Sequence, residues 1–281
     1  MLREGDPGFD WKIYESKDDS LTKDYRNQYD ATVKVLSDTT KVPLVNDVNT
    51  ANTFTSQLAS SVFGTGVTWD GLQFHMHAGS EHTINGKRYD LEMHTVHVKD
   101  GEQSTLDAGN GFVAAAMGLI FDVDDYDKSV TDDQVRIIDT FFDSMKWGTA
   151  GEPVVDVVSY GAIMNMADFE NRWIYKGSVT TPPCAENVYW NVLSTIYPIK
   201  QRHLDAFKTK LDEGTSGLSA KGNWRLIQDL KGQQPALVKK GAISTEELAA
   251  NPEKAGGLVA ATVILAVIAF FALIGCAVFG F

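Results

Sequence analysis

Histidine is the residue type whose spacing in this sequence points most directly to chemistry. Of the six histidines in the 281-residue chain, five lie between positions 75 and 97. The dipeptide Asn85-Gly86 divides them and is a strong signal for a two-residue hairpin turn, because both of its residues tolerate φ > 0. With this dipeptide as the turn, the numbers of cross-strand partners add up to 171, so His77 lies opposite His94. His75 is two residues from His77 and shares its strand face.

Three imidazoles on one face of a hairpin form a ligand set suited to zinc. Directly opposed Cβ atoms are about 4.5–5.5 Å apart, so the ring nitrogens can converge on one point. Catalytic zinc takes three protein ligands and leaves a fourth position for water. A His-x-His pair alone is more often structural, and it is the third histidine opposite the pair that favours a metal. The sequence has neither the HExxH helix of zinc proteases nor the second-motif spacing of a cupin barrel.

Two polar residues precede these histidines on the same strand face. Gln73 and Glu92 each lie two residues before one of the three proposed ligands. Side chains of this kind accept hydrogen bonds from ligand imidazoles and fix their tautomers, and we expect this role here. By the same alternation, His82 and His97 are expected to point to the opposite face as structural histidines.

From about Val67 onward the chain has the pattern of a β protein. Runs of β-branched and aromatic residues predict strands of a mostly covered sheet at residues 67–77, 89–98, 111–123 and 186–199. Apolar residues at helical spacing predict peripheral helices at residues 131–145 and 200–211. The first 45 residues are polar and predict no strong element. The fold class is therefore expected to be mainly β, with peripheral helices.

The composition excludes several classes of protein. The chain has 25 Lys and Arg residues against 37 Asp and Glu residues, a net charge of −12, which argues against a nucleic-acid partner. Two cysteines cannot support a disulfide-rich scaffold, and no CxxC motif is present for a zinc ribbon or a thioredoxin site. The hydrophobic fraction of 43% and the charged fraction of 22% are those of a packed globular protein.

The C-terminal segment has the composition of a membrane anchor. Residues 255–281 contain no charged side chain and are long enough for a transmembrane helix, since about 20 apolar residues cross a bilayer core. A GPI-type tail is the competing interpretation, but Gly256 and Gly257 enter the apolar run without a polar spacer. Residues 234–254 are predicted to form a stalk. The N-terminus has no apolar run typical of a signal peptide, so we expect either a mature form or insertion by the tail.

Three separated blocks resemble those of one enzyme family. Residues 73–98 read QFHMHAGSEHTINGKRYDLEMHTVHV, which is similar to the zinc-site signature of the α-class carbonic anhydrases, above all their plant, algal and bacterial forms. Residues 177–193, GSVTTPPCAENVYWNVL, resemble the family's active-site threonine loop, and residues 223–230, NWRLIQDL, resemble its C-terminal core motif. The resemblance implies a single domain around a large twisted, mostly antiparallel sheet. The expected divisions are 1–64 (a divergent N-terminal segment), 65–233 (the zinc domain core), 234–254 (the stalk) and 255–281 (one transmembrane helix).

The resemblance also implies an activity, the zinc-dependent reversible hydration of CO2 to bicarbonate. The family's metal ligands fall on His75, His77 and His94. The residues that orient these ligands fall on Gln73 and Glu92. The gatekeeper threonine falls on Thr180, oriented by Glu81, and Thr181 follows as a contact for bicarbonate. The wall of the CO2 pocket, which would equally serve as core, is expected at Val96, Ala116, Val179, Val188 and Trp190.

Two departures from the family pattern bear on this activity. No histidine precedes His75, so the cleft histidine that passes the product proton to buffer in efficient members is missing, and slow or buffer-dependent turnover is expected. Cys184 matches a disulfide position of secreted members, but the other cysteine, Cys276, lies in the apolar segment, so Cys184 is expected to be a free, buried thiol. An alternative function therefore stays open: a carbonic-anhydrase-like structural subunit of a larger membrane complex, photosynthetic or respiratory, with weak or no activity.

The sequence gives conflicting signals for orientation in a membrane. Lys239, Lys240 and Lys254 precede the apolar segment, and the positive-inside rule would place the domain in the cytoplasm. The resemblance to exported members favours a lumenal or extracytoplasmic domain, with the thylakoid lumen among the candidate compartments. The expected partners are CO2 and bicarbonate, the lipid bilayer through residues 255–281, and a membrane protein complex.

Overall fold

The computed structural model describes residues 13–15, 21–45, 52–56, 67–99, 114–228 and 235–239. These residues all belong to one compact unit, which extends from Met1 to Gly241. The predicted transmembrane segment lies outside the described residues, as does the predicted stalk from residue 240 onward. Within the described ranges, no helix combines the length and the apolar character that a membrane span needs.

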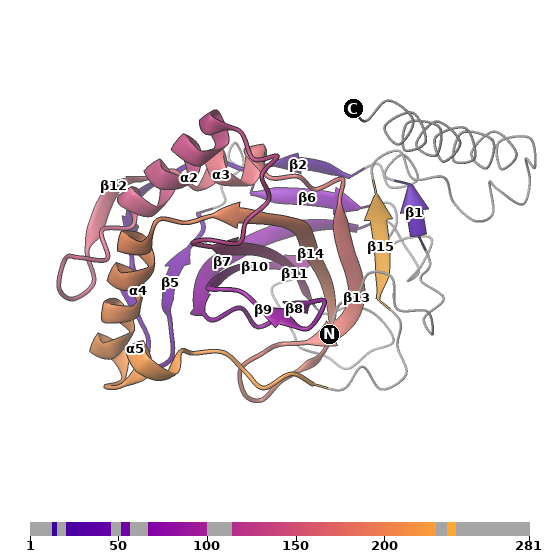
Figure 1. The fold of residues 1–281 in the computed structure, drawn as a ribbon. Coiled ribbons are helices and arrows are strands. Elements are labelled where there is room, and N and C mark those ends of the chain that lie inside the picture. Colours follow the sequence, from indigo (N-terminus) through magenta and orange to yellow (C-terminus); the bar gives the residue numbers. More distant parts are fainter. Residues whose placement is uncertain are drawn as a thin grey trace, which may run out of the picture. The chain divides into compact units, whose positions relative to one another are not determined.

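The central element is a curled, mixed sheet of eleven strands (Figure 1). Its main path runs in the order β1 (Ile13–Glu15), β15 (Ala236–Lys239), β13 (Arg172–Ser178), β14 (Glu186–Pro198), β11 (Ala114–Asp122), β10 (Leu91–Lys99), β7 (Val67–Ala78), β5 (Thr40–Pro43) and β4 (Lys34–Val35). Two further strands join it where β7 pairs with β6 (Thr53–Ser56), which pairs with β2 (Thr22–Asp24). Most neighbouring strands are antiparallel, as expected; β1 with β15 and β11 with β14 are parallel.

Some strands differ from the sequence expectation. Residues 21–45, for which no strong element was predicted, contribute β2 to β5, and β3 (Gln28–Thr32) pairs with β12 (Val154–Val158) in a separate ribbon. Residues 236–239 were assigned to the stalk, but they form β15, whose apolar side chains are buried and which pairs with β13. Strands this short have little periodicity of their own, and they form because partners far along the chain give them a surface to pack on.

The helices pack on one face of the sheet (Figure 1). They are α2 (Asp132–Ser144), α3 (Tyr160–Met166), α4 (Gln201–Gly214) and α5 (Leu218–Lys221). The predictions of helices at 131–145 and 200–211 are confirmed by α2 and α4. Thr131 begins α2 with a capping box, in which its hydroxyl accepts from the backbone N–H of Gln134 while the Gln134 side chain accepts from the backbone N–H of Thr131.

The two faces of the central strands pack against different side chains. On β7, Phe74 and Met76 belong to the larger core, which the sheet shares with the helices. His75 and His77 alternate with them and therefore point to the other face. A smaller apolar cluster around Trp190 lies on that face. β11 is buried at every position, as its continuous apolar run predicts.

A short ribbon contains the predicted turn. β8 (Thr83–Ile84) pairs with β9 (Lys87–Arg88) around Asn85 and Gly86. These two turn residues have φ angles of 52° and 81°. Both angles are positive, so the turn predicted from this dipeptide is confirmed.

The longer strands β7 and β10 pair in a register two residues away from the one that the turn alone predicts. His94 lies opposite His75, and Glu92 lies opposite His77. The predicted pairing of His77 with His94 is therefore wrong. The N–H groups of Gly79 and Ser80 still donate to the carbonyls of Asp90 and Tyr89, and the next pair is Thr83 with Arg88. Glu81 and His82 therefore have no counterpart on the other strand, and these two extra residues account for the shift. A shift of two residues preserves the side-chain alternation, so the three histidines still share one face.

Candidate metal centre

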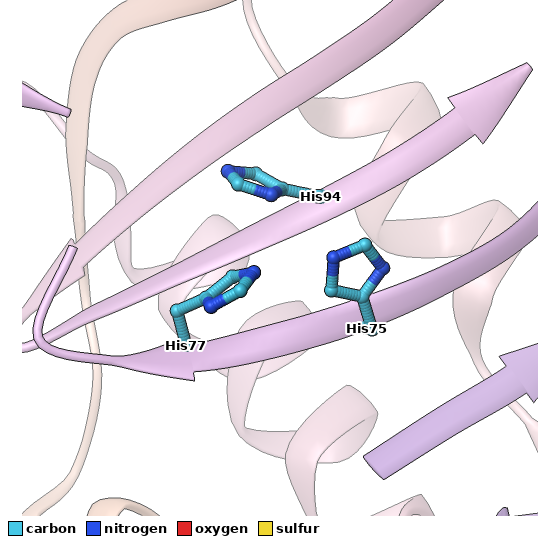
Figure 2. Close-up of side chains that lie close together, drawn as sticks. All are labelled: His75, His77 and His94. Atoms are coloured by element: carbon cyan, nitrogen blue, oxygen red, sulfur yellow. The ribbon is translucent and has the colours of Figure 1, made fainter. Parts of the chain in front are cut away.

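Three imidazoles meet on the sheet face that the helices do not cover, and Figure 2 shows them turned toward one another. The ring centroids of His75 and His77 are 5.0 Å apart, those of His75 and His94 are 5.3 Å apart, and those of His77 and His94 are 4.7 Å apart. One nitrogen atom of each ring lies within 4.8 Å of a nitrogen of each other ring. Two adjacent strands thus direct three nitrogen ligands toward one point, which suits a tetrahedral metal with one open position.

Hydrogen bonds fix the outer nitrogens of two rings. His75 donates from Nδ1 to Oε1 of Gln73 over 3.0 Å, and His94 donates from Nε2 to Oε1 of Glu92 over 2.9 Å. Both acceptors are residues that the sequence places behind the ligands. With the outer nitrogens protonated, Nε2 of His75 and Nδ1 of His94 present their lone pairs to the centre.

The third ring is held by the backbone. His77 donates from Nδ1 to the carbonyl oxygen of Asn223 over 2.9 Å. The Asn223 side chain is itself fixed, because Oδ1 accepts from the N–H of Ala78 over 2.7 Å and Nδ2 donates to the carbonyl of Met76 over 2.9 Å. Sequence reasoning missed this partner. A main-chain carbonyl far along the chain leaves no local signal, and only the resemblance of the block at 223–230 pointed to this segment.

The inner side of the site contains buried polar atoms that lack a protein partner. Among the described residues, neither Nε2 of His77 nor Oε2 of Glu81 has a hydrogen-bond partner. Oε2 of Glu81 lies 3.5 Å from Nε2 of His77 and 3.9 Å from Nδ1 of His94. A buried polar atom without a partner costs free energy, and a cation at the centre would remove that cost. The donor set and its orphaned atoms therefore fit a zinc ion.

Electrostatics favour metal binding by these rings. Burial and the two neighbouring imidazoles hold the pKa of His75 well below its ordinary value. Burial also lowers the pKa of His77, although Glu81 opposes the shift. Burial acts to lower the pKa of His94, but the carboxylate of Glu92 outweighs it and raises that pKa. Metals bind neutral imidazole, so the first two rings need no deprotonation at neutral pH and the third is the strongest base.

His82 lies beside the centre. It donates from Nδ1 to Oε1 of Glu92 over 2.6 Å, and its Nε2 accepts from the hydroxyl of Tyr175 over 2.6 Å. The ring centroids of His82 and His94 are 6.0 Å apart. The expectation that His82 points to the opposite face is wrong, because β7 ends at Ala78 and strand alternation does not extend past that residue.

Glu92 is a fully buried carboxylate that accepts hydrogen bonds from several donors. Oε1 accepts from both His82 and His94, and Oε2 accepts from the backbone N–H of His82 over 2.8 Å. Burial acts to raise the pKa of Glu92, but the two imidazoles outweigh it and hold the pKa well below its ordinary value. The carboxylate is therefore ionised at neutral pH, when it can best polarise His94.

His97 points to the other face, as expected. It is fully buried in the larger core, where its Nε2 lies 2.9 Å from the hydroxyl of Tyr25. The Phe54 ring packs edge-on against it at a centroid distance of 4.9 Å. These contacts are those of a structural histidine.

Glu81 is oriented from one side only. Its Oε1 accepts from the backbone N–H of Arg225 over 2.6 Å. Thr180 is half-buried in the segment after β13, and within the described part of the chain the structure gives no hydrogen bond between its hydroxyl and Glu81. Their interaction therefore stays a prediction, with Oε2 of Glu81 as the atom that would accept.

A second group of metal-ligand residue types lies between α2 and α4. Asp139, Asp143 and His203 offer ligand atoms within 4.8 Å of one another. Cations already surround them, since Asp139 accepts from Lys200 over 2.6 Å, from Arg202 over 2.8 Å and from His203 over 2.7 Å. This group is an ion-pair network that joins two helices.

Comparison with known proteins identifies the family. A sequence model of the eukaryotic-type carbonic anhydrases matches residues 17–235, which is most of the chain. The chain belongs to this family. The match extends beyond residues 65–233, the stretch in which the recognisable motifs lie, and it includes the strands from β2 to β6.

Curated carbonic anhydrases match the chain over part of their length. "Alpha carbonic anhydrase 4" of Arabidopsis thaliana is 28% identical over 164 residues, which are 58% of this chain and 51% of the relative. Human "Carbonic anhydrase 7" is 30% identical over 173 residues, which are 57% of this chain and 62% of the relative. The matched part of the chain thus spans about half, 51%, of the length of the Arabidopsis relative. The solved structure of the α-carbonic anhydrase of Photobacterium profundum is 22% identical to this chain. The superposition has a TM-score of 0.58 and covers 84% of this chain and 87% of the bacterial chain, which shows that the two share a fold.

The residues expected to form the CO2 pocket of a carbonic anhydrase gather beside the imidazoles. Ala116, Val188 and Trp190 are buried in the smaller apolar cluster, and Val179 packs against it. The Trp190 ring lies 4.7 Å from that of His94 between centroids. Val96 is half-buried on β10, two residues after His94. The structure therefore provides an apolar surface next to the candidate metal position.

The threonine loop is more exposed than this wall. Thr181 is half-buried, and its carbonyl accepts from the N–H of Cys184 over 2.8 Å. Cys184 is a free thiol, as expected, but it is half-buried where a buried residue was expected. Its φ of 57° belongs to a turn, which holds the side chain near the surface.

Proposed function

We propose that this carbonic anhydrase family member catalyses the zinc-dependent, reversible hydration of CO2 to bicarbonate and a proton. The observation that carries the proposal is the buried Nε2 of His77, which has no partner among the described residues and which faces the inner nitrogens of His75 and His94. Zinc held by these three residues would lower the pKa of water to about 7 and so supply a hydroxide nucleophile near neutral pH.

We assign to Thr180 and Glu81 the orientation of the attacking oxygen. The Thr180 hydroxyl would accept a hydrogen bond from that oxygen and donate its own proton to Oε2 of Glu81. Glu81 is prepared for this role, because Arg225 holds Oε1 and leaves Oε2 buried and unpartnered among the described residues. An ionised carboxylate only accepts, so it sets the direction of the Thr180 hydrogen bond.

The apolar wall suits the substrate. CO2 has no charge and no net dipole, so a surface that excludes water holds it near the nucleophile without a charged partner. We assign this surface to Val96, Ala116, Val179, Val188 and Trp190. Thr181, on the polar side of the same loop, is a contact for bicarbonate.

The proton produced by hydration has to leave by another route than an upstream histidine. No histidine occurs in the first 74 residues of the chain. We therefore propose that soluble buffer accepts the proton directly, which makes turnover depend on buffer concentration.

The location of the enzyme is a separate proposal. We propose that residues 255–281 anchor the chain in a lipid bilayer by a single pass, with the catalytic domain in a lumenal or extracytoplasmic space such as the thylakoid lumen, beside a membrane protein complex. Support comes from the uncharged sequence of that segment. Protease treatment of sealed membrane vesicles tests the side: digestion of the domain in cytoplasm-side-out vesicles would contradict it. Migration of the domain at its monomer mass on a native gel would contradict the complex.

Removal of the metal tests the proposed activity. CO2 hydration by the purified chain, followed by stopped flow, is expected to disappear after dialysis against a zinc chelator and to return on addition of one equivalent of zinc. Activity that survives complete zinc removal would overturn the proposal. The oriented imidazoles favour this enzyme over the structural subunit, because a docking surface has no need for three fixed tautomers.

A further inference from the structure

Trp224 lies in a slot formed by two glycines of different segments. Gly79 and Gly222 both have positive φ angles, 77° and 73°. A Cβ atom at Gly79 would lie 2.6 Å from Cδ1 of Trp224, and a Cβ atom at Gly222 would lie 2.8 Å from the same atom. Both positions therefore need glycine for the backbone angle and for the close approach of the indole ring.

Arg88 covers the open side of this ring. The central carbon of its guanidinium group lies 3.9 Å from the centroid of the Trp224 ring, a cation–π contact. The same guanidinium donates from Nη1 to the backbone carbonyl of Ser80. Arg88 thus joins the segment around Gly79 to the segment around Trp224. We call Gly79, Arg88, Gly222 and Trp224 the Trp224 clasp.

The residues on either side of Trp224 orient two members of the candidate site. The carbonyl of Asn223 accepts from Nδ1 of His77 over 2.9 Å. The N–H of Arg225 donates to Oε1 of Glu81 over 2.6 Å. Both are backbone groups. The side chain of Asn223 anchors one of them through its bonds with Ala78 and Met76, and the guanidinium of Arg225 anchors the other by donating to Ser178. The Trp224 ring, which lies between them in the chain, is a further anchor for both.

The same clasp also fixes the chain on which Glu81 lies. Gly79 and Ser80 immediately precede Glu81, and the clasp holds one by packing and the other by a hydrogen bond. Arg88 is therefore one tie between the segment of the donor, Arg225, and the segment of the acceptor, Glu81. Asn223 provides another through its side-chain bonds with Ala78 and Met76. Loss of Arg88 would loosen the Arg225 side of this junction without disturbing the hydrophobic core.

We propose that Arg88 is a positioning residue for the metal centre. Through the Trp224 clasp it sets the Asn223 carbonyl that orients His77 and the Arg225 amide that orients Glu81. The contacts of Arg88 that carry this inference are with Trp224 and the Ser80 carbonyl, not with the imidazoles. Its charge also interacts with the carboxylates of Glu81 and Glu92. An effect of Arg88 on catalysis rests on the proposed function, but its effect on the positions of the Arg225 amide and the Asn223 carbonyl can be measured without catalysis.

The test compares Arg88→Met with Lys87→Met. Lys87 is a matched control, because it is the neighbouring cation on β9, lies 4.6 Å from the Tyr89 ring centroid and pairs with Asp125 on the surface. The first readout is hydrogen exchange of the Arg225 amide in zinc-free protein. We expect Arg88→Met to accelerate this exchange at least tenfold relative to wild type and Lys87→Met to leave it unchanged. Equal exchange in both variants would overturn the proposal.

The second readout is the Kd for zinc, measured by competition with a chromophoric chelator. Changes in residues that orient metal ligands cost roughly 10- to 100-fold in affinity, and we expect Arg88→Met to be near the lower end, about tenfold. Arg88→Lys keeps a cation over the ring and is expected to recover part of this loss. If Arg88→Lys binds zinc as weakly as Arg88→Met, the role of the cation is overturned. If Arg88→Met binds zinc with wild-type affinity, the whole proposal is overturned.

Failure of the proposed function gives a different pattern. A wild-type chain that binds no zinc or hydrates no CO2 would remove the function, while the exchange comparison would still decide whether Arg88 fixes the Arg225 amide. Should Arg88→Met fail to fold, Arg88→Gln, which keeps a donor for Ser80 but places no cation over Trp224, replaces it in the same comparison. Unchanged exchange and unchanged zinc affinity in that variant would again overturn the proposal.

Discussion

Oε1 of Glu92 lies 2.9 Å from Nε2 of His94, on the side of the ring that faces away from the other two imidazoles. The carboxylate raises the pKa of His94 against the opposing effect of burial. A more basic imidazole is a stronger metal ligand, so Glu92 influences a metal that it does not touch. Glu92 is in turn kept ionised by His82 and His94.

Replacement of Glu92 tests this relationship. Glu92→Gln keeps the shape of the side chain but removes its charge, and we expect the Kd for zinc to rise roughly 10- to 100-fold. The control is Asp156→Asn, which removes a charge from an exposed position on β12. Isothermal titration or chelator competition measures both. A Glu92→Gln protein with the zinc affinity of Asp156→Asn would show that His94 does not depend on the carboxylate.

Replacement of Thr180 tests the assigned orientation of the nucleophile. Thr180→Val keeps the shape but removes the hydroxyl, and we expect kcat/KM for CO2 hydration to fall roughly 10²-fold while the Kd for zinc stays unchanged. Thr209→Val on the exposed face of α4 is the matched control, since its hydroxyl only donates to the carbonyl of Asp205. A rate equal to that of the control would remove Thr180 from the mechanism.

The missing upstream histidine predicts dependence on buffer. At saturating CO2 and low buffer concentration, we expect kcat of the zinc-loaded chain to rise with added imidazole, because proton release then limits turnover. Stopped-flow rates at constant pH and ionic strength measure this. A kcat that does not respond to imidazole would mean that another group of the protein passes the proton on.

His97 gives a prediction about stability and pH. Burial lowers the pKa of His97 to about 3, compared with 6.5 for an ordinary histidine. The unfolded chain therefore takes up a proton on this residue below about pH 6.5, whereas the folded chain stays neutral there. The stability that depends on neutral His97 is fully present above pH 6.5 and is lost as the pH falls toward 3, by about 1.4 kcal/mol for each pH unit.

The variant His97→Gln isolates this contribution. At pH 7.5 it is expected to be less stable than wild type by about 1–3 kcal/mol, because it disturbs the buried contact with Tyr25. As the pH falls to 4.5 this difference is expected to shrink or reverse, since the variant has no proton to take up at this position on unfolding. Urea denaturation in the presence of a chelator measures both proteins. Parallel pH profiles would show that the pKa of His97 in the folded chain is not lowered relative to that in the unfolded chain.

The hairpin shows what the sequence can and cannot predict. The turn at Asn85 and Gly86 could be predicted because the positive φ angles leave a signal in residue type. The register of β7 with β10 could not, because Glu81 and His82 have no counterpart on the other strand and shift the pairing by two residues between the turn and the histidines. The convergence of the imidazoles did not depend on the register, since only an odd shift would have reversed the face.

Some hydrogen-bond partners of the three imidazoles could likewise be predicted from the sequence, and others could not. Gln73 and Glu92 follow from strand alternation, which places them behind their histidines. Asn223 could not be found by spacing, because its carbonyl comes from a distant segment and uses no side chain. His82 was misplaced because it lies beyond the end of β7, where alternation has no meaning. Resemblance to the family was needed to connect Thr180 with Glu81 at all.

CO2 hydration by zinc-supplied His94→Ala protein is the most direct test of the proposed centre. We expect this variant to lose nearly all activity and to bind zinc far more weakly than wild type, since it lacks one of three ligands. His203→Gln, which removes an imidazole from the ion-pair network between α2 and α4, is expected to keep both activity and zinc affinity. A His94→Ala protein that hydrates CO2 at the wild-type rate would contradict the assignment of the metal centre.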